Sequence, residues 1–315
     1  MTARDPGFIA ALRARVHGEV RDGEALSRWS TYRIGGPATV LHPAGAEDVA
    51  HALRVAGEHH VAWFALGLGS NLLFPDDGLT ALVIRLGKGI DALVQDGARW
   101  TIGAGMPQPL AAKRTAAAGF GGIHKMVGVP GSVGGGIVMN AGCHGAEWRD
   151  TVQSVAVIDE IGNDRVVPAA DARFTYRRSA LGRVVVVSAT VDLHPEDAAT
   201  LESETEELYQ WRKTMTPFNQ PCCGSVFKNP ALPAEHDPAS PRTAGQFIEA
   251  AGLKGMRVGP VEISPMHANY FVNTGGGTAA DVKQLMVLAQ RKVADQFGVA
   301  LEPEVKLVTS EGLIG

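Results

Sequence analysis

The amino-acid sequence predicts a mixed α and β fold, and three observations carry that prediction. The chain has 315 residues, 45% of them apolar, which is enough for two or three packed units. Short runs of β-branched and aliphatic residues alternate with stretches of helical periodicity. Gly, Pro or Asp residues separate these segments, as expected of turns between strands and helices.

The first two thirds of the chain contain both kinds of element. Aliphatic runs predict strands over residues 81–86, 153–158 and 184–193. Helical spacing of apolar residues predicts helices over 46–58 and 109–118.

The charged segment 195–213 is predicted to be a helix and to mark a domain boundary. Four glutamates lie mostly on one wet face of this helix: Glu202, Glu204, Glu206 and Glu207. The chain starts a new pattern after it.

Two elements are predicted near the C-terminus. Thr278 and Asp281 have the spacing of a capping box, and apolar residues then recur at helical spacing until Gly298, which predicts a core helix. Residues 303–308 alternate like a strand with one buried face, with Glu304 on the side opposite Val305 and Leu307.

Charge and hydropathy exclude several classes of partner. Lys and Arg number 29 against 33 Asp and Glu, a net charge of −4, and no basic run is longer than a pair. A nucleic-acid binder needs a basic stripe to neutralise phosphates, so nucleic acid is not an expected partner. No stretch approaches the roughly 18 apolar residues that span a bilayer. We therefore expect a soluble, cytoplasmic protein with no membrane partner.

The cysteines and histidines indicate neither disulfides nor a metal site. The cysteines are three in number, and two of them, Cys222 and Cys223, are adjacent, where pairing is geometrically awkward. Cys143 is the third. We expect a reducing compartment, with Cys222 and Cys223 as small packing residues. The ten histidines form no H-x-x-x-H pair and the sequence has no C-x-x-C pair, so no metal is predicted.

Glycine is concentrated in one part of the chain, with ten glycines among the 27 residues from Gly119 to Gly145. Such clustering indicates either several tight turns or a backbone wrapped closely around a ligand. Two segments, 67–73 (GLGSNLL) and 128–136 (GVPGSVGGG), could each hold an anion on successive backbone N–H groups. Neither has the Rossmann spacing. Two such loops suit a dinucleotide with a diphosphate bridge, and a glycine-rich crossover between strands is the alternative.

Two further segments carry polar groups without a decisive pattern. Residues 174–179 (FTYRRS) place a phenol beside two guanidiniums, which a solvated surface loop would also do. Residues 224–230 (GSVFKNP) place Ser225 after a glycine and near a lysine. No G-x-S-x-G elbow surrounds Ser225, so a hydrolase nucleophile is not indicated.

Taken in order, eight segments resemble the UDP-N-acetylenolpyruvoylglucosamine reductase family, flavin enzymes that complete UDP-N-acetylmuramate for bacterial peptidoglycan. The likeness runs nearly end to end. The segments are residues 30–38 (STYRIGGPA), 67–73, 128–145 (GVPGSVGGGIVMNAGCHG), 174–181 (FTYRRSAL), 224–230, 247–255 (FIEAAGLKG), 267–273 (HANYFVN) and 301–305 (LEPEV).

The resemblance implies an α+β fold, with a two-subdomain FAD-binding fold of the vanillyl-alcohol oxidase type followed by a C-terminal α+β substrate-binding domain. The expected divisions are 1–86 for FAD-binding subdomain 1, 87–210 for subdomain 2 and 211–302 for the substrate domain. A C-terminal strand, about 303–315, is expected to return to the first subdomain. The sequence leaves the oligomeric state open, a monomer included.

The resemblance also implies an NADPH-dependent flavoenzyme that reduces UDP-N-acetylenolpyruvoylglucosamine to UDP-N-acetylmuramate, with FAD and NADPH as cofactors. The family's catalytic trio falls on Arg177, which stabilises developing negative charge, Ser225, the proton donor, and Glu304, which assists at the enol. Substrate-binding positions fall on Tyr176, Lys228, Asn229 and His267. The expected FAD contacts are Gly67, Gly69, Ser70, Asn71, Leu72, Gly131, Ser132, Val133, Gly134, Gly135, Asn140, Ala141 and Gly142.

The chain departs from the family's longer form in one respect. Arg177 and Ser225 are separated by 47 residues, too few for an extra substrate-capping tyrosine loop, so the chain looks like the loopless second type. Two other functions stay open at the level of sequence. One is another FAD-linked oxidase or dehydrogenase of the same fold, which would have no reason to carry GSVFKNP and LEPEV together. The other is a non-catalytic UDP-sugar-binding protein, which would not retain flavin.

Overall fold

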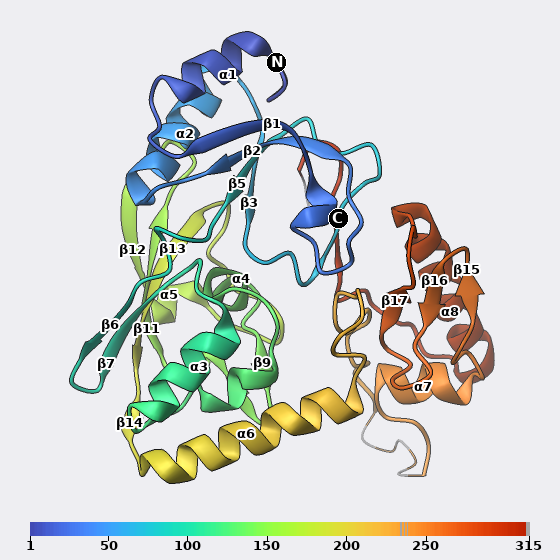
Figure 1. Ribbon diagram of the computed structural model, residues 1–315. Coiled ribbons are helices and arrows are strands. Elements are labelled where there is room, and N and C mark those ends of the chain that lie inside the picture. Colours follow the sequence, from blue (N-terminus) through green and yellow to red (C-terminus); the bar gives the residue numbers. More distant parts are fainter. Residues whose placement is uncertain (234, 236, 238, 313–315) are drawn as a thin grey trace. The chain divides into compact units, whose positions relative to one another are not determined.

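The computed structural model describes residues 1–233, 235, 237 and 239–312 (Figure 1). The chain divides into two compact units, and each is built from three separate segments. Unit 1 comprises Met1–Glu24, Pro37–Leu68 and Leu79–Trp211, and unit 2 comprises Ala25–Gly36, Gly69–Gly78 and Arg212–Gly315. The predicted three-part division at residues 86, 210 and 302 is a different partition and stays a prediction.

Unit 1 begins with a four-stranded sheet in the order β1-β2-β5-β3, formed by β1 (Glu19–Ala25), β2 (Pro37–His42), β5 (Leu82–Arg85) and β3 (Trp63–Leu66). Strands β2 and β3 both run parallel to β5. Parallel strands of one sheet need a crossover connection. Helix α2 (Ala46–Glu58) is the crossover from β2 to β3, which lie on either side of β5. Helix α1 (Pro6–Arg13) begins at Asp5, whose carboxylate accepts the N–H groups of Gly7 and Phe8.

A second sheet in unit 1 is antiparallel and has the order β12-β11-β13-β7-β6. The helices and short strand pairs of this part of unit 1 follow β7 in the sequence, and β14 is the last of these elements. The strands are β6 (Leu93–Asp96), β7 (Arg99–Gly103), β11 (Val152–Ile158), β12 (Asp164–Pro168) and β13 (Val185–Asp192). The remaining elements are α3 (Gln108–Ala117), α4 (Val133–Val138), α5 (Ala169–Ala172), the 3-10 turns His124–Gly128 and Trp148–Asp150, and the pairs β8 (Phe120–Gly121) with β14 (His194–Pro195) and β9 (Gly142–Cys143) with β10 (Ala146–Glu147).

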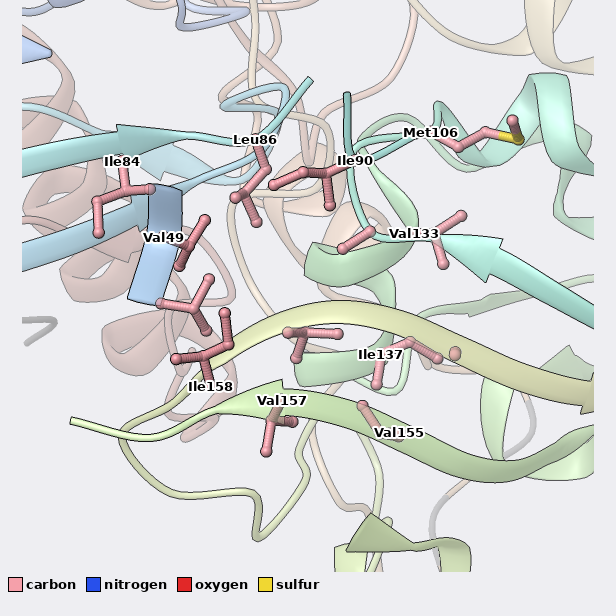
Figure 2. Close-up of a cluster of buried hydrophobic side chains, with 14 of the residues drawn as sticks. Val49, Ile84, Leu86, Ile90, Met106, Val133, Ile137, Val155, Val157 and Ile158 are labelled. Atoms are coloured by element: carbon pink, nitrogen blue, oxygen red, sulfur yellow. The ribbon is translucent and has the colours of Figure 1, made fainter. Parts of the chain in front are cut away.

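The core of unit 1 is one hydrophobic cluster that joins both of its sheets. Figure 2 shows Val49 of α2 and Ile84 of β5 on one side and Val155 and Val157 of β11 on the other, and Ile137 of α4 belongs to the same cluster. These side chains are almost completely buried. Burial of about 25 cal/mol per Å² of apolar surface is the main force that holds such a cluster together.

Asp48, at the start of α2, accepts hydrogen bonds from three backbone N–H groups of unit 1. Its side chain is buried, and the carboxylate accepts the N–H groups of His17 at 2.8 Å, Gly18 at 2.8 Å and Ala44 at 2.7 Å. Burial alone would raise the pKa of Asp48. The hydrogen bonds from these donors outweigh that effect, so the pKa lies below its ordinary value.

We expect Asp48→Ala to lower the free energy of unfolding at pH 7 by about 2–4 kcal/mol, because three partly buried N–H groups lose a charged acceptor. The folded pKa lies below the unfolded one, so this stabilisation is present above about pH 4 and is lost as the pH falls through the folded value. Urea denaturation at pH 7, 4 and 3 should therefore give a gap in the free energy of unfolding between the unsubstituted protein and Asp48→Ala, and this gap should become smaller as the pH falls. Glu47→Ala removes an exposed carboxylate one residue away and should change stability little. A gap of equal size at every pH would contradict the prediction.

Unit 2 contains a three-stranded antiparallel sheet in the order β15-β16-β17, with two helices. The elements are β15 (Arg257–Val258), β16 (Val261–Ile263), β17 (Phe271–Asn273), α7 (Ala244–Ala250) and α8 (Ala279–Phe297). Early segments of the chain belong to its core, since Tyr32, Ile34 and Leu73 lie in one hydrophobic cluster with Phe227, Phe271 and the buried face of α8. The short 3-10 turn Leu26–Arg28 and β4 (Leu72–Leu73) belong to these early segments.

Helix α8 confirms the capping prediction in detail. Thr278 and Asp281 form both hydrogen bonds of the capping box, and the helix ends at Phe297 before Gly298, which has φ 66°. The other predicted helices correspond to α2, α3 and α6 (Ala198–Met215), and the predicted strands 81–86, 153–158 and 184–193 correspond to β5, β11 and β13. The four glutamates of α6 are exposed, as predicted. Among the described residues, no helix has both the length and the apolar composition to cross a membrane.

The predicted strand 303–308 is shorter than expected. Only β18 (Lys306–Leu307) forms, parallel to β4, and Pro303 makes an isolated bridge with Phe227. The regular ladder is interrupted because the N–H groups of Glu304 and Val305 both donate to the carbonyl of Val226, at 2.8 and 3.2 Å. For the longer segment 303–315, residues 313–315 lie outside the described part of the chain.

Candidate functional site

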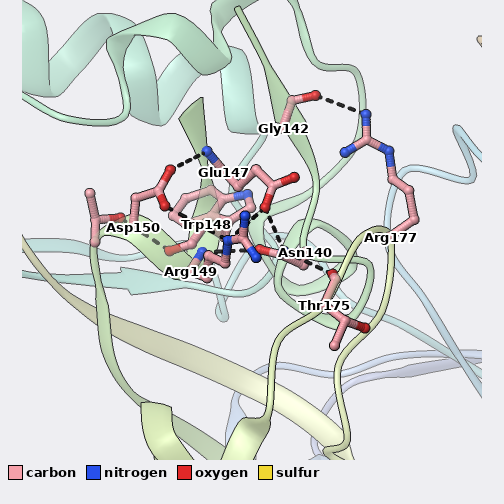
Figure 3. Close-up of polar contacts among 9 residues, drawn as sticks. Asn140, Gly142, Glu147, Trp148, Arg149, Asp150, Thr175 and Arg177 are labelled. Carbon is pink, nitrogen blue, oxygen red and sulfur yellow. Dashed lines mark hydrogen bonds and ion pairs between the residues drawn. The ribbon is translucent and has the colours of Figure 1, made fainter. Parts of the chain in front are cut away.

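Arg177 lies in a tight turn of unit 1. Thr175 and Arg178 close the turn by exchanging backbone hydrogen bonds of 2.9 and 3.2 Å. Arg177 itself has φ 56°, a left-handed conformation that costs a non-glycine residue about 1–2 kcal/mol. Its Nη2 donates to the carbonyl of Gly142 at 3.1 Å (Figure 3), and Cζ lies 4.9 Å from the centre of the Tyr176 ring. The surrounding structure therefore holds this cation in a strained but defined place.

Asn140 connects the Arg177 turn to the segment that follows α4. Figure 3 shows its fully buried amide: Nδ2 donates to the carbonyl of Thr175 and to Glu147, both at 3.0 Å, and Oδ1 accepts the N–H of Arg149 at 3.0 Å. An Asn amide can make about four hydrogen bonds, and three of them are made within the protein. The predicted FAD contact of Asn140 stays a prediction, and this geometry favours its backbone for that role.

The first glycine segment approaches the second within unit 1. A Cβ placed on Gly67 would lie 2.0 Å from Oγ of Ser132, so only glycine fits beside that hydroxyl. Ser132 begins α4, and its Oγ accepts the N–H of Gly135 at 3.4 Å. Gly135 is exposed and would have room for a Cβ. The role predicted for this loop, binding the diphosphate of FAD, stays a prediction.

Other glycines of the same loop serve packing inside the protein. A Cβ on Gly134 would lie 2.9 Å from Cβ of Ala104, and one on Gly136 would lie 2.2 Å from Oε1 of Gln108. Gly131 has φ 110°, and Val133 is buried in the core. Ala141 and Gly142 lead into β9, where Gly142 pairs with Glu147. Close packing and turns therefore account for several of these glycines, and a backbone wrapped around a ligand stays a prediction for the others.

The continuation of the first glycine segment belongs to unit 2. Gly69 has φ 63°, and a Cβ there would lie 2.0 Å from the carbonyl of Trp29. Ser70 is half-buried, and Leu72 pairs with Lys306. Asn71 makes hydrogen bonds on both sides of Val305: its Nδ2 donates to the carbonyl of Glu304 at 3.1 Å, and its carbonyl accepts the N–H of Lys306 at 2.9 Å. The side chain of Asn71 thus has a partner other than the predicted cofactor.

Ser225 and Glu304, 79 positions apart in the sequence, belong to segments that pair in unit 2. The carbonyl of Val226, next to Ser225, accepts the N–H of Glu304 at 2.8 Å. The pairing continues from Lys228, whose N–H donates to the carbonyl of Glu302 at 2.9 Å. Gly224, which precedes Ser225, has φ 79° and open space around its Cα. The backbone hydrogen bonds therefore pair the two irregular segments that carry two of the three predicted catalytic residues.

Two predicted substrate residues have partners within unit 2. The Lys228 ammonium pairs with Glu302 and lowers the pKa of that carboxyl. Oδ1 of Asn229 accepts the N–H of Ala244, the first residue of α7, at 3.1 Å. The Lys228 ammonium thus lies beside an exposed carboxylate, and the bond to Ala244 uses only the oxygen of the Asn229 amide.

His267 and Tyr176 differ in accessibility. Burial lowers the pKa of His267, and the charge of Arg212 lowers it further, so the ring is neutral at pH 7. Its Nδ1 accepts the N–H of Asn269 at 3.2 Å, and its ring packs edge-on against Tyr270 at 4.8 Å between centroids. Tyr176, in unit 1, is 49% exposed and is available to a ligand.

The adjacent cysteines are free thiols, as the packing interpretation requires. Burial raises the pKa of both the Cys222 and the Cys223 thiols, which keeps them protonated at neutral pH. Cys223 lies beside the fully buried Tyr32 in the core of unit 2.

Sequence reasoning did not single out Asn269, although it lies in the quoted segment 267–273. Its buried amide makes two hydrogen bonds with the backbone of Phe227. Its only signal in the sequence is a polar residue directly before an apolar strand, which many surface turns share.

Two family models match the chain. The model described as "UDP-N-acetylenolpyruvoylglucosamine reductase, C-terminal domain" matches residues 216–308, and the model described as "FAD binding domain" matches residues 37–166. Together they confirm the predicted order, an FAD-binding part followed by a C-terminal domain.

Individual relatives agree with the family models. The chain is 40% identical to a UDP-N-acetylenolpyruvoylglucosamine reductase of Rubrobacter xylanophilus, over 90% of this chain and 94% of the relative. It is 37% identical to the protein of the same name from Halalkalibacterium halodurans, over 96% and 98%. The crystal structure of the reductase from Thermus caldophilus superposes with a TM-score of 0.77 at 30% identity, covering 92% of this chain and 99% of that one.

The structural match confirms the predicted α+β fold class over nearly the whole chain. The sequence matches have the identity and coverage that establish common family membership. The chain belongs to the UDP-N-acetylenolpyruvoylglucosamine reductase family.

Proposed function

We propose that the protein reduces the enolpyruvyl group of UDP-N-acetylenolpyruvoylglucosamine and so forms UDP-N-acetylmuramate for peptidoglycan, with NADPH as the reductant. Family membership makes the chain an FAD-dependent oxidoreductase. The observation that carries the residue assignment is the hydrogen bond from the Glu304 N–H to the Val226 carbonyl, because it pairs the segments of a predicted proton donor and a predicted carboxylate. We place the reaction in the cytoplasm, with no nucleic-acid or membrane partner.

Gly67, Ser132 and Gly135 are the residues of unit 1 that would hold the diphosphate of FAD. The close approach of Gly67 to Ser132 and the exposure of Gly135 support this role. FAD held there would supply the hydride chemistry that links NADPH to the methylene carbon of the substrate. The residues of the chain then have to stabilise charge and supply a proton.

Arg177 stabilises the negative charge that develops next to the substrate carboxylate. A fixed cation lowers the energy of that charged state more than the energy of the bound substrate. The contact with Gly142 and the left-handed backbone hold the guanidinium in one place, so little reorganisation is needed during the reaction. This pre-organisation supports the assignment of Arg177.

Ser225 donates the proton that completes the reduction, and Glu304 assists at the enol. General acids act within hydrogen-bond reach of the atom they protonate. The pairing of residues 226–228 with 302–305 sets the backbone position of both side chains. Asn71 adds a hydrogen bond to the Glu304 carbonyl, while the Glu304 N–H bonds to Val226.

The polar end of the substrate is assigned to Tyr176, Lys228, Asn229 and His267. Lys228 offers an ammonium group to the substrate diphosphate, which would either replace Glu302 as the partner of the ammonium or bind it together with Glu302. Asn229 offers amide donors, and Tyr176 an exposed phenol. The loopless second type of the family fits the short separation between Arg177 and Ser225.

Two alternatives are less well supported. Another FAD-linked oxidase would explain the FAD-binding part, but not the family match over residues 216–308. A non-catalytic UDP-sugar-binding protein would not need the FAD-binding part.

We expect the purified protein to be yellow and to release FAD, not FMN, on denaturation, because two glycine segments suit two phosphates. Absorbance near 450 nm and chromatography of the released flavin measure this. Gly67→Val should lower the flavin content severalfold, because its side chain would collide with Ser132. Gly57→Val, at an exposed position of α2 with open space around its Cα and no left-handed backbone, is the control. A colourless protein that cannot be reconstituted with FAD would overturn the enzyme assignment.

A further inference from the structure

Asn269 is a buried polar residue whose side chain is devoted to the backbone beside Ser225. Only 3% of its surface is exposed. Oδ1 accepts the N–H of Phe227 at 3.0 Å, and Nδ2 donates to the carbonyl of Phe227 at 2.8 Å. The backbone carbonyl of Asn269 also accepts the N–H of Val226 at 2.9 Å. One residue thus makes three hydrogen bonds with the two residues that directly follow Ser225.

Through these contacts Asn269 satisfies the backbone of Val226 and Phe227 as a neighbouring β-strand would. Its amide presents one donor and one acceptor side by side, as a peptide group does, and both engage the same residue. Because the Val226 carbonyl accepts from Glu304, the segment 226–227 is bonded to Asn269 and to the Glu304 segment at the same time. Displacement of Phe227 would therefore displace Ser225 relative to Glu304.

Asn269 is itself held in place. Its N–H donates to Nδ1 of the neutral His267, and the next residue, Tyr270, packs against the His267 ring. A rigid support is what a reacting group needs, because a misplacement of about 1 Å can lower a rate by about 100-fold.

We propose that Asn269 is a positioning residue that aligns the Ser225 hydroxyl for proton transfer. The proposal rests on the proposed role of Ser225 as proton donor. It predicts a selective effect: Asn269 should affect the step that needs the Ser225 proton and leave the reduction of flavin by NADPH unchanged.

The test is Asn269→Leu, which keeps the size of the side chain and removes both hydrogen bonds to Phe227. In stopped-flow experiments on the FAD-loaded protein, flavin reoxidation by the UDP-enolpyruvyl sugar should slow by about 10-fold or more. Flavin reduction by NADPH should stay within about twofold, and kcat should fall while KM for the sugar changes little. Equal losses in both half-reactions would indicate a merely structural role and overturn the proposal.

The matched control is Asn273→Leu in the same segment. Asn273 is also buried, and its amide bonds the carbonyl of Tyr32 and the N–H groups of Gly275 and Gly277, away from residues 225–227. Its substitution should lower the melting temperature without changing the ratio of the two half-reaction rates. If Asn273→Leu changes that ratio as much as Asn269→Leu does, the selective role of Asn269 is wrong.

A double-mutant cycle separates this proposal from the proposed function. In a Ser225→Ala background, Asn269→Leu should slow reoxidation by less than about twofold, because the group it aligns is gone. Full additivity would refute positioning through Ser225 while leaving Ser225 as the acid. Near-normal reoxidation in Ser225→Ala alone would refute both. Should Asn269→Leu not fold, Asn269→Asp at pH 8 has the same shape, keeps the acceptor and loses the donor to Phe227, and the same comparisons decide.

Discussion

Ser225→Ala should slow flavin reoxidation by the UDP-enolpyruvyl sugar at least 100-fold. Loss of a positioned general acid typically lowers a rate by about 10²–10⁴, or roughly 3–5 kcal/mol of barrier. Reduction of the flavin by NADPH does not need this proton and should keep its rate. Stopped-flow measurement of the flavin absorbance times the two half-reactions separately. Affinity for the sugar should change far less than turnover, since the proton is transferred only in the transition state.

Ser225→Cys tests whether the missing element is the proton. A thiol is a weaker hydrogen-bond donor than an alcohol but a stronger acid, so Cys should recover much of the reoxidation rate that Ala loses. Recovery by Cys but not by Ala identifies the proton, since a packing role would treat the two similarly. If Ser225→Ala turns over at a near-normal rate with saturating sugar, Ser225 is not the acid, and Glu304 or a water molecule takes that role.

Arg177→Ala is expected to slow reoxidation by about 10²–10³, the usual effect of removing one group that stabilises developing negative charge. The same stopped-flow experiment should find flavin reduction by NADPH near its normal rate. Arg178→Ala is the matched control, because it removes the adjacent, exposed guanidinium from the same turn.

The left-handed backbone at position 177 calls for a second comparison. Arg177→Gly removes the guanidinium but relieves the strain of φ 56°, whereas Arg177→Ala keeps most of the strain. Similar losses in both variants would assign the effect to the missing charge. Equal slowing of both half-reactions would instead mean that Arg177 serves folding or the placement of FAD.

Local signals in the sequence predicted local structure well. The capping box of Thr278 and Asp281 and the stop at Gly298 correspond to helix α8, and the helix predicted over 46–58 has the bounds of α2. Such features depend on a few neighbouring residues, whose hydrogen bonds and periodicity can be recognised without knowledge of the fold. The strand at 303–308 failed because its pairing depends on Val226, which is 77 positions before Pro303.

The candidate site was predicted by family resemblance more than by residue chemistry. Nothing in the sequence alone indicates that Asn140 supports the turn of Arg177, or that Asn71 bonds the Glu304 carbonyl. Both asparagines were predicted as cofactor residues because the family resemblance implies FAD contacts at their positions. Their side chains also hydrogen-bond to backbone that is distant in sequence, and such long-range partners have no signature in a single sequence.

The composition of unit 2 has a consequence for synthesis on the ribosome. Tyr32, Ile34 and Leu73 leave the exit tunnel early, yet the core that buries them includes Phe227, Phe271 and helix α8. Domains usually fold as units during translation, beginning at the N-terminus. Residues 25–36 and 69–78 must therefore stay unburied while more than 130 further residues, from Leu79 to Trp211, are made. Nascent chains arrested before residue 212 should present these apolar side chains to chaperones, and unit 2 should be completed only after helix α8 and the segment around Val305 have left the exit tunnel.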